Sequence, residues 1–360
     1  MQCPLTIGVT LYNSQKYLNS LYACFDSFLE SSEFNLLFVD DASIDSSLES
    51  AKNLFGDSAK YISNIENLGV SKSRNLIFQN ANSRYVTFLD ADDTINLRAL
   101  IDLIRSPLLA SVNSHPDIVL CPYHVVQANN LGVTKVFGRC ENKKICNSEL
   151  SEMIINYLQL PNRNGDFVQC FSKIYSLDYI QNNNIFFDES LKNFEDVMFL
   201  ADSLAYFPEV HTNLHSFYTH IVHYPGVSET CNKQRSLISH FGFIKAINNM
   251  KCTLYEYLKI LHGFSPADHD LLNRLEAQAI AIYTSITLVQ NSVKVVSPLS
   301  FCKYYREVSS VLNLRTVHNS FLAYDSVVAG GSQLLSFLVK IKCYLLVTLL
   351  CCWKFKRRYG

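Results

Sequence analysis

Three aspartates stand within four positions of the segment FLDADDTI (88–95), directly after an apolar run. Carboxylates placed so closely repel one another unless a cation or a hydrogen-bond donor balances them. If the backbone is extended, Asp90 and Asp92 point the same way, as two ligands of a hard cation such as Mg²⁺ or Mn²⁺ would. The alternative is a turn followed by a capped helix, in which Asp93 is a candidate cap for a helix beginning near Asn96.

Polar residues also end two other apolar runs. LTIGVTLYN (5–13) ends in Asn13, and FNLLFVDDAS (34–43) ends in Asp40 and Asp41. Helical spacing predicts helices over 17–31, 45–55 and 70–81, with further strands over 60–69 and 84–93. This alternation predicts a mainly parallel sheet, which binds ligands beyond the carboxyl ends of its strands. One such aspartate alone would be read as a cap or turn residue, but three strand ends agree.

The composition describes a folded chain without a marked charge bias. Its 360 residues are 48% apolar and 18% charged, with 31 basic and 32 acidic residues, so no nucleic-acid partner is indicated. The twelve cysteines are scattered without a CxxC pair, and the first residues lack the basic region of a signal peptide. We therefore expect mostly buried thiols in a reducing cytoplasm. Neither a G-x-G-x-x-G nor a Walker loop is present, which argues against dinucleotide binding or an ATPase.

Five segments occur in the order typical of one enzyme family: TIGVTLYN, FVDDAS, ENLGVSKSRN, FLDADD and NFEDVMFL. Over residues 4–230 the chain resembles the GT-A glycosyltransferases of family 2, especially bacterial members that build capsule or O-antigen polysaccharide. The resemblance implies an α/β fold, in which a Rossmann-like nucleotide-binding sheet is joined to an acceptor subdomain. We expect a nucleotide-sugar half over 1–105, an acceptor and catalytic half over 106–230, and a helical appendage over 231–330 that includes helices at 236–262 and 268–292. A membrane-associating tail over 331–360 would complete the chain.

The resemblance implies a UDP-sugar donor and assigns roles to the strand ends. Asp90 would lie toward the ribose, and Asp92 would hold the divalent metal that neutralises the diphosphate. The ring of Tyr12 would stack on the base, with Thr10 lining the same place. Either Asp41 or Asp40 would accept the imide N–H of uracil.

The segment ENLGVSKSRN supplies the other donor-side candidates. Asn67 and Gly69 form the turn before a helix, and glycine would allow close backbone approach. Arg74 resembles the family arginine near the base and diphosphate, where a guanidinium matches the acceptors. The alternative for Arg74 is an intrahelical or surface ion pair.

Glu195 and Asp196 precede an apolar helical run and resemble the family's Glu-Asp pair. Asp196 would take the proton of the acceptor hydroxyl as this attacks the anomeric carbon, which implies a single displacement with inversion. The alternative is a pair of first-turn carboxylates favoured by the helix dipole.

The segment YTHIVHYPGVSET (218–230) resembles the family's polar loop that closes over the diphosphate. The family commonly has an arginine there, and this chain has histidines instead. His220 and His223 are candidates to contact phosphate or metal, and Ser228 is a candidate to bond phosphate.

The last stretch (334–360) is apolar and then basic, but Lys340 and Lys342 interrupt it. Because a spanning helix wants about 20 apolar residues, we expect a helix lying in the membrane interface, with Trp353 at headgroup depth. The alternative is a buried C-terminal helix with a solvated basic tail. Peripheral attachment to the cytoplasmic face of the inner membrane would suit a lipid-linked or oligosaccharide acceptor.

The sequence therefore predicts an inverting glycosyltransferase that moves a hexose or N-acetylhexosamine from a UDP-sugar. Two other readings stay open. A nucleotidyltransferase making nucleotide-sugars would want a glycine-rich basic loop after the first strand, where LYNSQKYL has no glycine. A catalytically inactive family member would serve as a subunit of an assembly complex.

Overall fold

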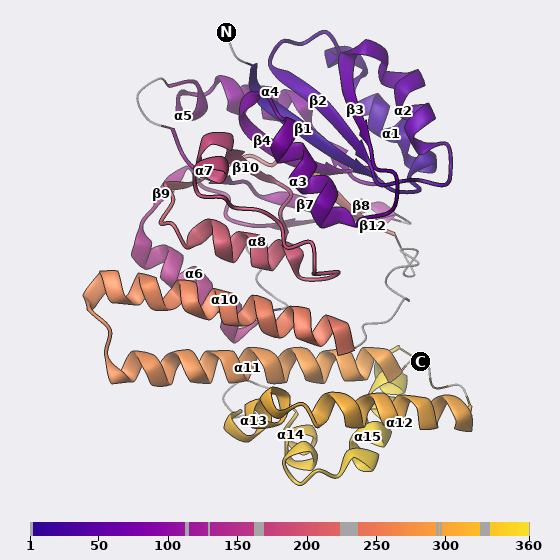
Figure 1. The fold of residues 1–360 in the computed structure, drawn as a ribbon, viewed down its shortest axis with the longest axis vertical. Helices are drawn as coiled ribbons and strands as arrows, with labels where there is room; N and C mark the ends of the chain where they lie inside the picture. The colour runs from indigo at the N-terminus through magenta and orange to yellow at the C-terminus, as the bar shows by residue number, and fades with distance from the viewer. Residues whose placement is uncertain are drawn as a thin grey trace. The chain divides into compact units, whose positions relative to one another are not determined.

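The computed structural model describes residues 3–111, 115–128, 130–161, 169–223, 237–292, 295, 297–324 and 332–359. The chain divides into two compact units, the first formed by residues 1–146 and 165–227 and the second by residues 147–164 and 228–360. Figure 1 shows the helices and strands of both units.

The first unit is built on a large sheet and a small one. The large sheet has the strand order β3-β2-β1-β4-β10-β6-β11-β9, and the small one β5-β12-β7-β8. The strands are β1 Cys3–Leu11, β2 Phe34–Asp40, β3 Ala59–Ser63, β4 Ser83–Asp90, β5 Thr94–Ile95, β6 Ile118–Leu120, β7 Tyr123–Gln127, β8 Asn130–Phe137, β9 Lys143–Ile145, β10 Lys173–Ser176, β11 Val210–Thr212 and β12 Tyr218–Val222.

Helices connect these strands as the sequence predicts for the first hundred residues. The helical elements are η1 Gln15–Tyr17, α1 Leu18–Phe25, η2 Asp26–Phe28, α2 Ser47–Phe55, η3 Gly56–Ser58, α3 Val70–Asn80, α4 Leu97–Arg105, α5 Pro107–Ala110, α7 Leu177–Asn182 and α8 Glu195–Leu204. Strands β3, β2, β1 and β4 are mutually parallel, and β10 is antiparallel to β4. The mainly parallel sheet is therefore confirmed at the half of the sheet that carries the aspartates.

The two faces of this sheet bury different residues because side chains alternate along each strand. Ile7, Val9 and Leu89 belong to a core cluster that includes residues of α1, α2 and α4. On the other face Phe78 of α3 contacts Phe88 of β4 edge-on, with 5.1 Å between ring centroids. Helix α3 thus packs against the strand that ends in the aspartate cluster.

Gly8 of β1 lets α3 approach the sheet closely. A Cβ atom at position 8 would lie 2.4 Å from Cγ2 and 2.7 Å from Cδ1 of Ile77 in α3, well inside van der Waals contact. The missing side chain at one strand position therefore sets the depth at which α3 lies on the sheet.

The second unit consists of helices. They are α6 Asn147–Gln159, α10 Leu237–His262, α11 Pro266–Asn291, α12 Pro298–Leu312, α13 Arg315–Ala323, α14 Gln333–Lys340 and α15 Tyr344–Tyr359. The helices predicted at 236–262 and 268–292 are confirmed as α10 and α11, and Phe243 of α10 stacks on Tyr283 of α11 at 4.0 Å between centroids. Within the described residues, no helix is long and apolar enough to cross a membrane.

Two predictions about details are wrong. The run 334–353 is not one helix, because the chain turns at residues 341–343, where Lys342 adopts a positive φ of 57° between α14 and α15. The cysteines are not mostly buried: of the eleven free thiols described, Cys121, Cys170 and Cys351 are buried, and four are exposed. The burial of each cysteine depends on which face of its helix or strand it occupies, and the number of cysteines in the sequence does not reveal this.

The fit of α3 on β1 can be tested by filling it. Gly8→Ala should lower the free energy of unfolding by about 1–3 kcal/mol, because the added methyl group overlaps Ile77. Urea unfolding followed by circular dichroism measures the loss. In an Ile77→Ala background the added methyl group has space, so Gly8→Ala should cost at least about 1 kcal/mol less there. Equal costs in the two backgrounds would contradict the proposed contact.

Candidate functional site

The carboxyl ends of β1, β2 and β4 meet at one edge of the large sheet. Thr10 of β1 is paired with Val39 on one side and Asp90 on the other, and Leu11 is paired with Asp40. Three strands that are separate in the sequence thus bring their polar ends together, as the alternation of elements predicts. Thr10 lies between the two acidic strand ends.

The two aspartates after β2 have different surroundings, although both are buried. Asp41 accepts hydrogen bonds from Asn64 Nδ2 (2.8 Å), Leu68 N (2.9 Å) and Gly69 N (2.8 Å), so it holds the turn before α3. Asp40 Oδ2 accepts from Ser43 N at 3.2 Å, whereas its Oδ1 is buried and has no partner within the described part of the chain. A buried carboxylate oxygen without a donor is costly, so Asp40 is the better candidate to receive a ligand's N–H.

Tyr12 and Asn13 continue β1 beyond the sheet. The Tyr12 side chain is about half exposed (51%), which leaves its ring accessible to a flat ligand. Asn13 has a positive φ of 51° and its side chain accepts a hydrogen bond from Ile44 N at 3.0 Å. The tyrosine is therefore presented by a fixed turn.

The turn before α3 is held by the chain itself. Gly69 has a φ of +92°, and a Cβ there would meet nothing within 4 Å, so its backbone conformation rather than crowding calls for glycine. Asn67 donates from Nδ2 to the carbonyl oxygen of Asp41 at 3.4 Å. Both residues act on the position of the α3 N-terminus.

Asp92 follows β4 and is partly exposed. Burial first, and then the neighbouring carboxylates of Asp93 and Asp90, raise the pKa of Asp92 to about 6. A carboxylate destabilised in this way would gain from a cation, since a cation removes both the repulsion and the loss of hydration.

Asp93 does not cap the helix near Asn96, so that prediction is wrong. Asn96 caps α4 with its own side chain, which accepts from Ala99 N at 3.1 Å. The Asp93 carboxylate instead accepts from Tyr218 OH at 2.5 Å and from Ile221 N at 2.7 Å, and lies 3.1 Å from His220 Nδ1. It thereby ties the aspartate loop to β12.

The side chains around Asp93 form a buried network that the sequence did not reveal. The ring of Tyr218 stacks on Phe171 at 4.3 Å between centroids, and His220 stacks on the same ring at 5.4 Å. Burial would lower the pKa of His220, but the Asp93 carboxylate outweighs burial and raises it. His220 therefore serves Asp93, and the contact with phosphate or metal considered for it is not what the structure favours.

His223 follows β12 and faces the aspartate loop. Its Nε2 lies 3.9 Å from Asp92 Oδ2, beyond hydrogen-bond distance, and is buried with no partner among the residues that the structure describes. The ring packs against Tyr17 at 5.0 Å between centroids. Within the described residues, no group of three or more His, Cys, Asp or Glu side chains forms a metal site. Ser228 lies outside the described residues.

Arg74 is the centre of the site. Its buried guanidinium reaches Asp196 Oδ1 with Nη1 at 2.6 Å and Asp90 Oδ1 with Nη2 at 3.3 Å, and a weaker contact of 3.5 Å joins Nη1 to Glu195 Oε1. Burial alone would lower the pKa of Arg74, but the three carboxylates raise it well above its usual value. The surface ion pair considered for Arg74 is thus replaced by a buried one that joins β4 to α8.

Helix α8 presents its two carboxylates in its first turn, where the helix dipole favours them. The residue before it, Phe194, has a positive φ of 67°, a strained conformation for an aromatic residue. Asp196 Oδ2 accepts the N–H of Cys170 at 3.2 Å, and the Cys170 thiol also hydrogen-bonds to the Asp196 carboxyl group. Burial first, and then Asp196, raise the pKa of Glu195 to about 7.

A second pair of contacts fastens α3 to the segment before α8. Asn75 donates from Nδ2 to Phe187 O at 2.9 Å and accepts from Phe187 N at 2.8 Å, and Lys72 pairs with Glu189 at 3.2 Å. Sequence reasoning missed Asn75, although its place beside Arg74 in the segment SKSRN was a signal.

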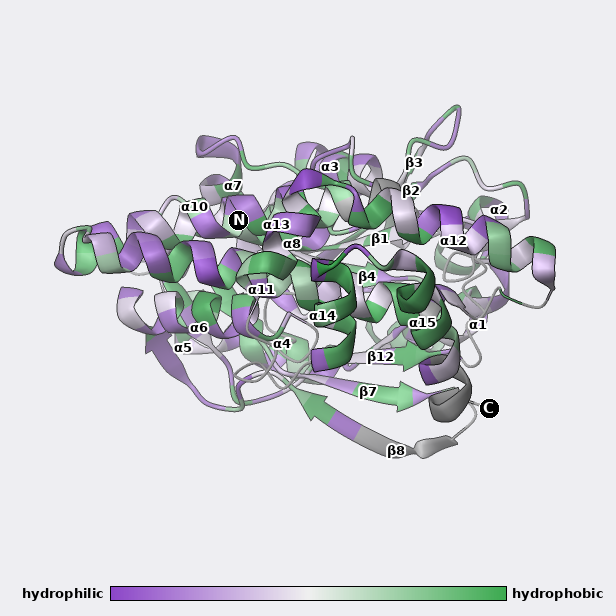
Figure 2. Cartoon of the chain, turned by 90° about the horizontal axis from the view of Figure 1, so that it is seen from below, coloured by the Kyte–Doolittle hydropathy of each residue, from purple (hydrophilic) through white to green (hydrophobic). Residues whose placement is uncertain are grey.

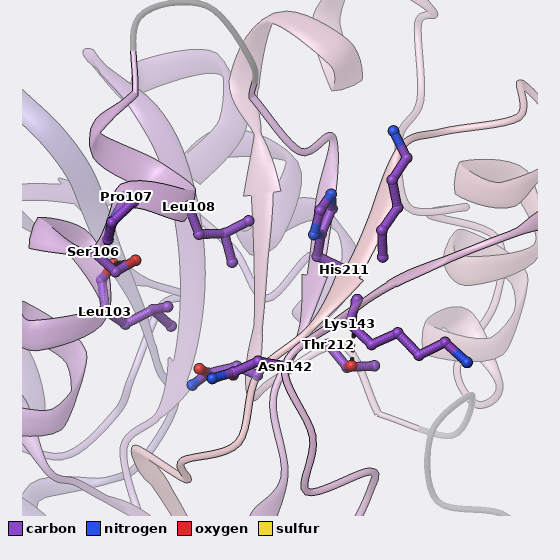
Figure 3. Close-up of a pocket in the computed structure, with 10 residues that line it drawn as sticks. Leu103, Ser106, Pro107, Leu108, Asn142, Lys143, His211 and Thr212 are labelled. Atoms are coloured by element: carbon purple, nitrogen blue, oxygen red, sulfur yellow. Dashed lines mark hydrogen bonds between the residues drawn. The ribbon is translucent and has the colours of Figure 1, made fainter.

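A pocket of about 310 Å³ lies elsewhere in the first unit, between the α4–α5 region and strands β9 and β11 (Figure 3). Of its polar side chains, His211 and Lys144 both pair with Glu209. It contains none of the predicted site residues, and it does not bear on the chemistry of the strand ends.

Residues 6–136 match the family model described as "Glycosyl transferase family 2". The chain carries a family 2 glycosyltransferase domain. The matched residues include Asp40, Arg74 and the aspartate cluster of this glycosyltransferase domain, and α8 lies beyond them.

Curated relatives are bacterial enzymes of wall polymers. TarS of Staphylococcus aureus, a poly(ribitol-phosphate) beta-N-acetylglucosaminyltransferase, is 27% identical over 198 residues, which cover 54% of this chain and 31% of TarS. A teichoic acid poly(glycerol phosphate) polymerase of Staphylococcus epidermidis is 33% identical over 96 residues, 25% of this chain and 13% of the polymerase. The alignments thus span about a third or less of these relatives.

Solved structures extend the likeness over the whole chain. The crystal structure of S. aureus TarS 1-349 in complex with UDP-GlcNAc superposes with a TM-score of 0.61 at 17% identity, covering 99% of this chain and 93% of that one. Against the longer S. aureus TarS structure the TM-score is 0.58, and 55% of that chain is covered. The α/β GT-A fold with additional C-terminal helices is therefore confirmed.

Removing the guanidinium of Arg74 should lower the free energy of unfolding of the glycosyltransferase domain. Arg74→Met leaves Asp196 and Glu195 buried without their cation, and should cost about 3–5 kcal/mol in urea unfolding at pH 7.5. The loss should shrink at pH 5, where Glu195, with its pKa of about 7, is protonated. The matched control is Lys72→Met on the same helix, whose exposed pair should be worth less than about 1 kcal/mol. Equal losses for the two variants would contradict the central role of Arg74.

Proposed function

We propose that the protein is an inverting glycosyltransferase that moves a hexose or N-acetylhexosamine from a UDP-sugar to a hydroxyl group of a saccharide. The carrying observation is that Arg74 contacts both Asp90, at a strand end of the nucleotide-binding sheet, and Asp196, at the start of α8. Asp90 would lie on the donor side of the site and Asp196 on the acceptor side. Because both carboxylates contact the guanidinium of Arg74, they lie close enough to act in a single displacement.

The donor would bind across the ends of β1, β2 and β4. Asp40 Oδ1 would accept the uracil imide N–H, since it is the buried oxygen without a partner, and Tyr12 would stack on the base. Asp41, Asn67 and Gly69 would support this pocket by fixing the turn. UDP-GlcNAc is the first donor to test, because TarS, which shares the fold, has been crystallised with it.

A divalent cation, Mn²⁺ or Mg²⁺, fits the residues around Asp92. Asp92 has a carboxylate with a raised pKa, and His223 has an unpartnered buried nitrogen beside it, so these two would hold the ion, with Asp90 nearby. Few protein ligands suffice where a substrate's phosphates and water complete the coordination. Bound there, the ion would supply positive charge that neutralises the diphosphate.

Asp196 would act as the base. Its Oδ1 is held by Arg74, so Oδ2, which also accepts from Cys170 N, is the oxygen that would receive the acceptor's proton. Oδ2 would take the proton of the acceptor hydroxyl while the oxygen forms a bond to the anomeric carbon and the bond from that carbon to UDP breaks. Attack from the face opposite UDP inverts the anomeric centre. Glu195 would remain beside Asp196 as a buried, readily protonated neighbour.

The acceptor we propose is a lipid-linked or oligosaccharide chain of a bacterial surface polysaccharide such as a capsule or O-antigen. The protein would work at the cytoplasmic face of the inner membrane, attached peripherally through residues 331–360. A polyol-phosphate polymer is a second acceptor to include, because the TarS name specifies poly(ribitol-phosphate).

The two other readings make different demands. A nucleotidyltransferase would need a basic, glycine-rich loop after β1, where the chain instead has Tyr12, Asn13 and η1. An inactive assembly subunit would have no use for a carboxylate at Asp196 held at 2.6 Å from Arg74. Donor turnover separates all three.

The class is tested by UDP release from a panel of UDP-sugars, with Mn²⁺, Mg²⁺ or EDTA, in the presence of saccharide and polyol-phosphate acceptors. One donor should be turned over in a metal-dependent manner, and Asp92→Ala should lose at least about 100-fold, since the loss of one cation ligand removes charge stabilisation of the leaving group. The control is Asp102→Ala in α4, away from the strand ends. No turnover, and no metal-dependent UDP binding in calorimetry, would overturn the proposal.

The base is tested by comparing the two carboxylates of α8. Asp196→Asn should lower kcat by about 10²–10⁴-fold with little change in the donor's binding constant, because the amide cannot accept the proton. Glu195→Gln should cost far less, since Glu195 has no assigned proton transfer. A larger loss in Glu195→Gln than in Asp196→Asn would move the base to Glu195.

A further inference from the structure

The last two helices of the second unit are apolar on both sides. Leu335, Leu338 and Val339 of α14, with Val347 and Cys351 of α15, are buried within the unit. The opposite side is apolar as well, and its exposed residues include Leu334, Phe337, Ile341, Leu345, Leu349 and Trp353. A helix that is apolar all round is normally covered on every side. The outward side of this helix pair is therefore an exposed apolar surface, which contact with an apolar environment would stabilise.

The two helices present this side as one surface. The turn between them is closed by hydrogen bonds from Cys343 N to Leu338 O and from Lys342 N to Val339 O, both 2.9 Å. Helices α14 and α15 contact each other along the hairpin. In Figure 2, which views the chain from below, both are strongly hydrophobic and lie side by side toward the viewer. Neither is long enough to span a bilayer, so a surface-lying arrangement is the one available to lipid.

The charged residues of this stretch of the sequence all have one sign. From residue 326 to residue 360 the sequence has no aspartate or glutamate, and its basic residues are Lys340, Lys342, Lys354, Lys356, Arg357 and Arg358. Lys342 is exposed at the turn, and Lys340 at the end of α14 is exposed as well, although its Nζ donates to Tyr324 O at 3.4 Å. An anionic surface complements this pattern. A second copy of the chain does not, because a symmetric contact would bring two basic rims together.

We propose that the outward side of the α14–α15 hairpin (residues 333–354) lies in the interface of an anionic lipid bilayer. The lysines at the turn contact lipid phosphates, and the ring of Trp353 lies at headgroup depth. This inference rests on the proposed function in one respect: a lipid-linked acceptor gives the attachment its use. The surface itself is tested without donor, metal or acceptor, so its failure and that of the proposed function are distinguishable.

Trp353 is the only tryptophan in the chain, and it reports directly on this surface. The full chain is titrated with vesicles of phosphatidylcholine alone or with 30% phosphatidylglycerol. With the anionic vesicles the emission should shift to shorter wavelength, be quenched by brominated lipid, and be shielded from acrylamide. No shift and no quenching with either vesicle would overturn the proposal. Emission already shielded from acrylamide in a monomer without lipid would show that protein covers the face, and would overturn it as well.

Matched variants locate the contact. Phe337→Glu should weaken binding by about tenfold or more, whereas Phe241→Glu on α10, at an equally exposed phenylalanine (57% for both), should not. Lys340→Gln with Lys342→Gln should weaken binding to anionic vesicles by about 20-fold and leave neutral vesicles unaffected. Circular dichroism shows that each variant is folded. Equal effects of Phe337→Glu and Phe241→Glu, or a concentration-dependent dimer that Phe337→Glu abolishes, would overturn the assignment to lipid.

Discussion

The ion cluster around Arg74 is the interaction on which the site depends. One guanidinium, nearly excluded from water, faces carboxylates from two distant parts of the sequence: Asp90 at the end of β4, and Glu195 and Asp196 at the start of α8. A lone charge buried in this way would be very unfavourable, so each partner makes the others tolerable. The same pairing fixes the distance between the end of β4 and the start of α8. Stability and chemistry therefore share the same atoms.

The depth of α3 and the position of β12 follow from that requirement. Arg74 reaches both carboxylate groups only if α3 lies low on the sheet, which Gly8 permits, and if Asn75 holds the segment before α8. On the other side of the loop, Asp93 accepts a hydrogen bond from Ile221 N and so fixes the position of β12, which ends just before His223. Asp90 and Asp92 face the site, while Asp93 faces the protein. The three adjacent aspartates thus divide the work of binding and of holding.

The sequence predicted what depends on local pattern, and missed what depends on pairing across the fold. Alternating strands and helices predicted the parallel sheet, and polar residues at the strand ends indicated the candidate site. Which of Asp40 and Asp41 has a buried carboxylate oxygen without a hydrogen-bond donor depends on the turn at Gly69, some 28 residues away. Likewise, Asp93 was only a candidate for a local helix cap, because its actual partners, Tyr218 and Ile221, are more than 120 residues distant in the sequence. The helix break between α14 and α15 depends on a positive φ at Lys342, which a lysine in the sequence does not predict.

The raised pKa values indicate that the ionised carboxylates of Asp92 and Glu195 destabilise the folded protein. The pKa values of Asp92 and Glu195, about 6 and 7, lie above those of the same groups in an unfolded chain, near 4. The folded state therefore binds more protons between about pH 4 and pH 7, and its stability falls as pH rises through that range. A ligand that brings positive charge to Asp92 reverses this loss by favouring the ionised form. Relief of the repulsion among the three aspartates would then contribute to the affinity for a cation. Arg74 on one side and the Asp93 network on the other hold these aspartates in place.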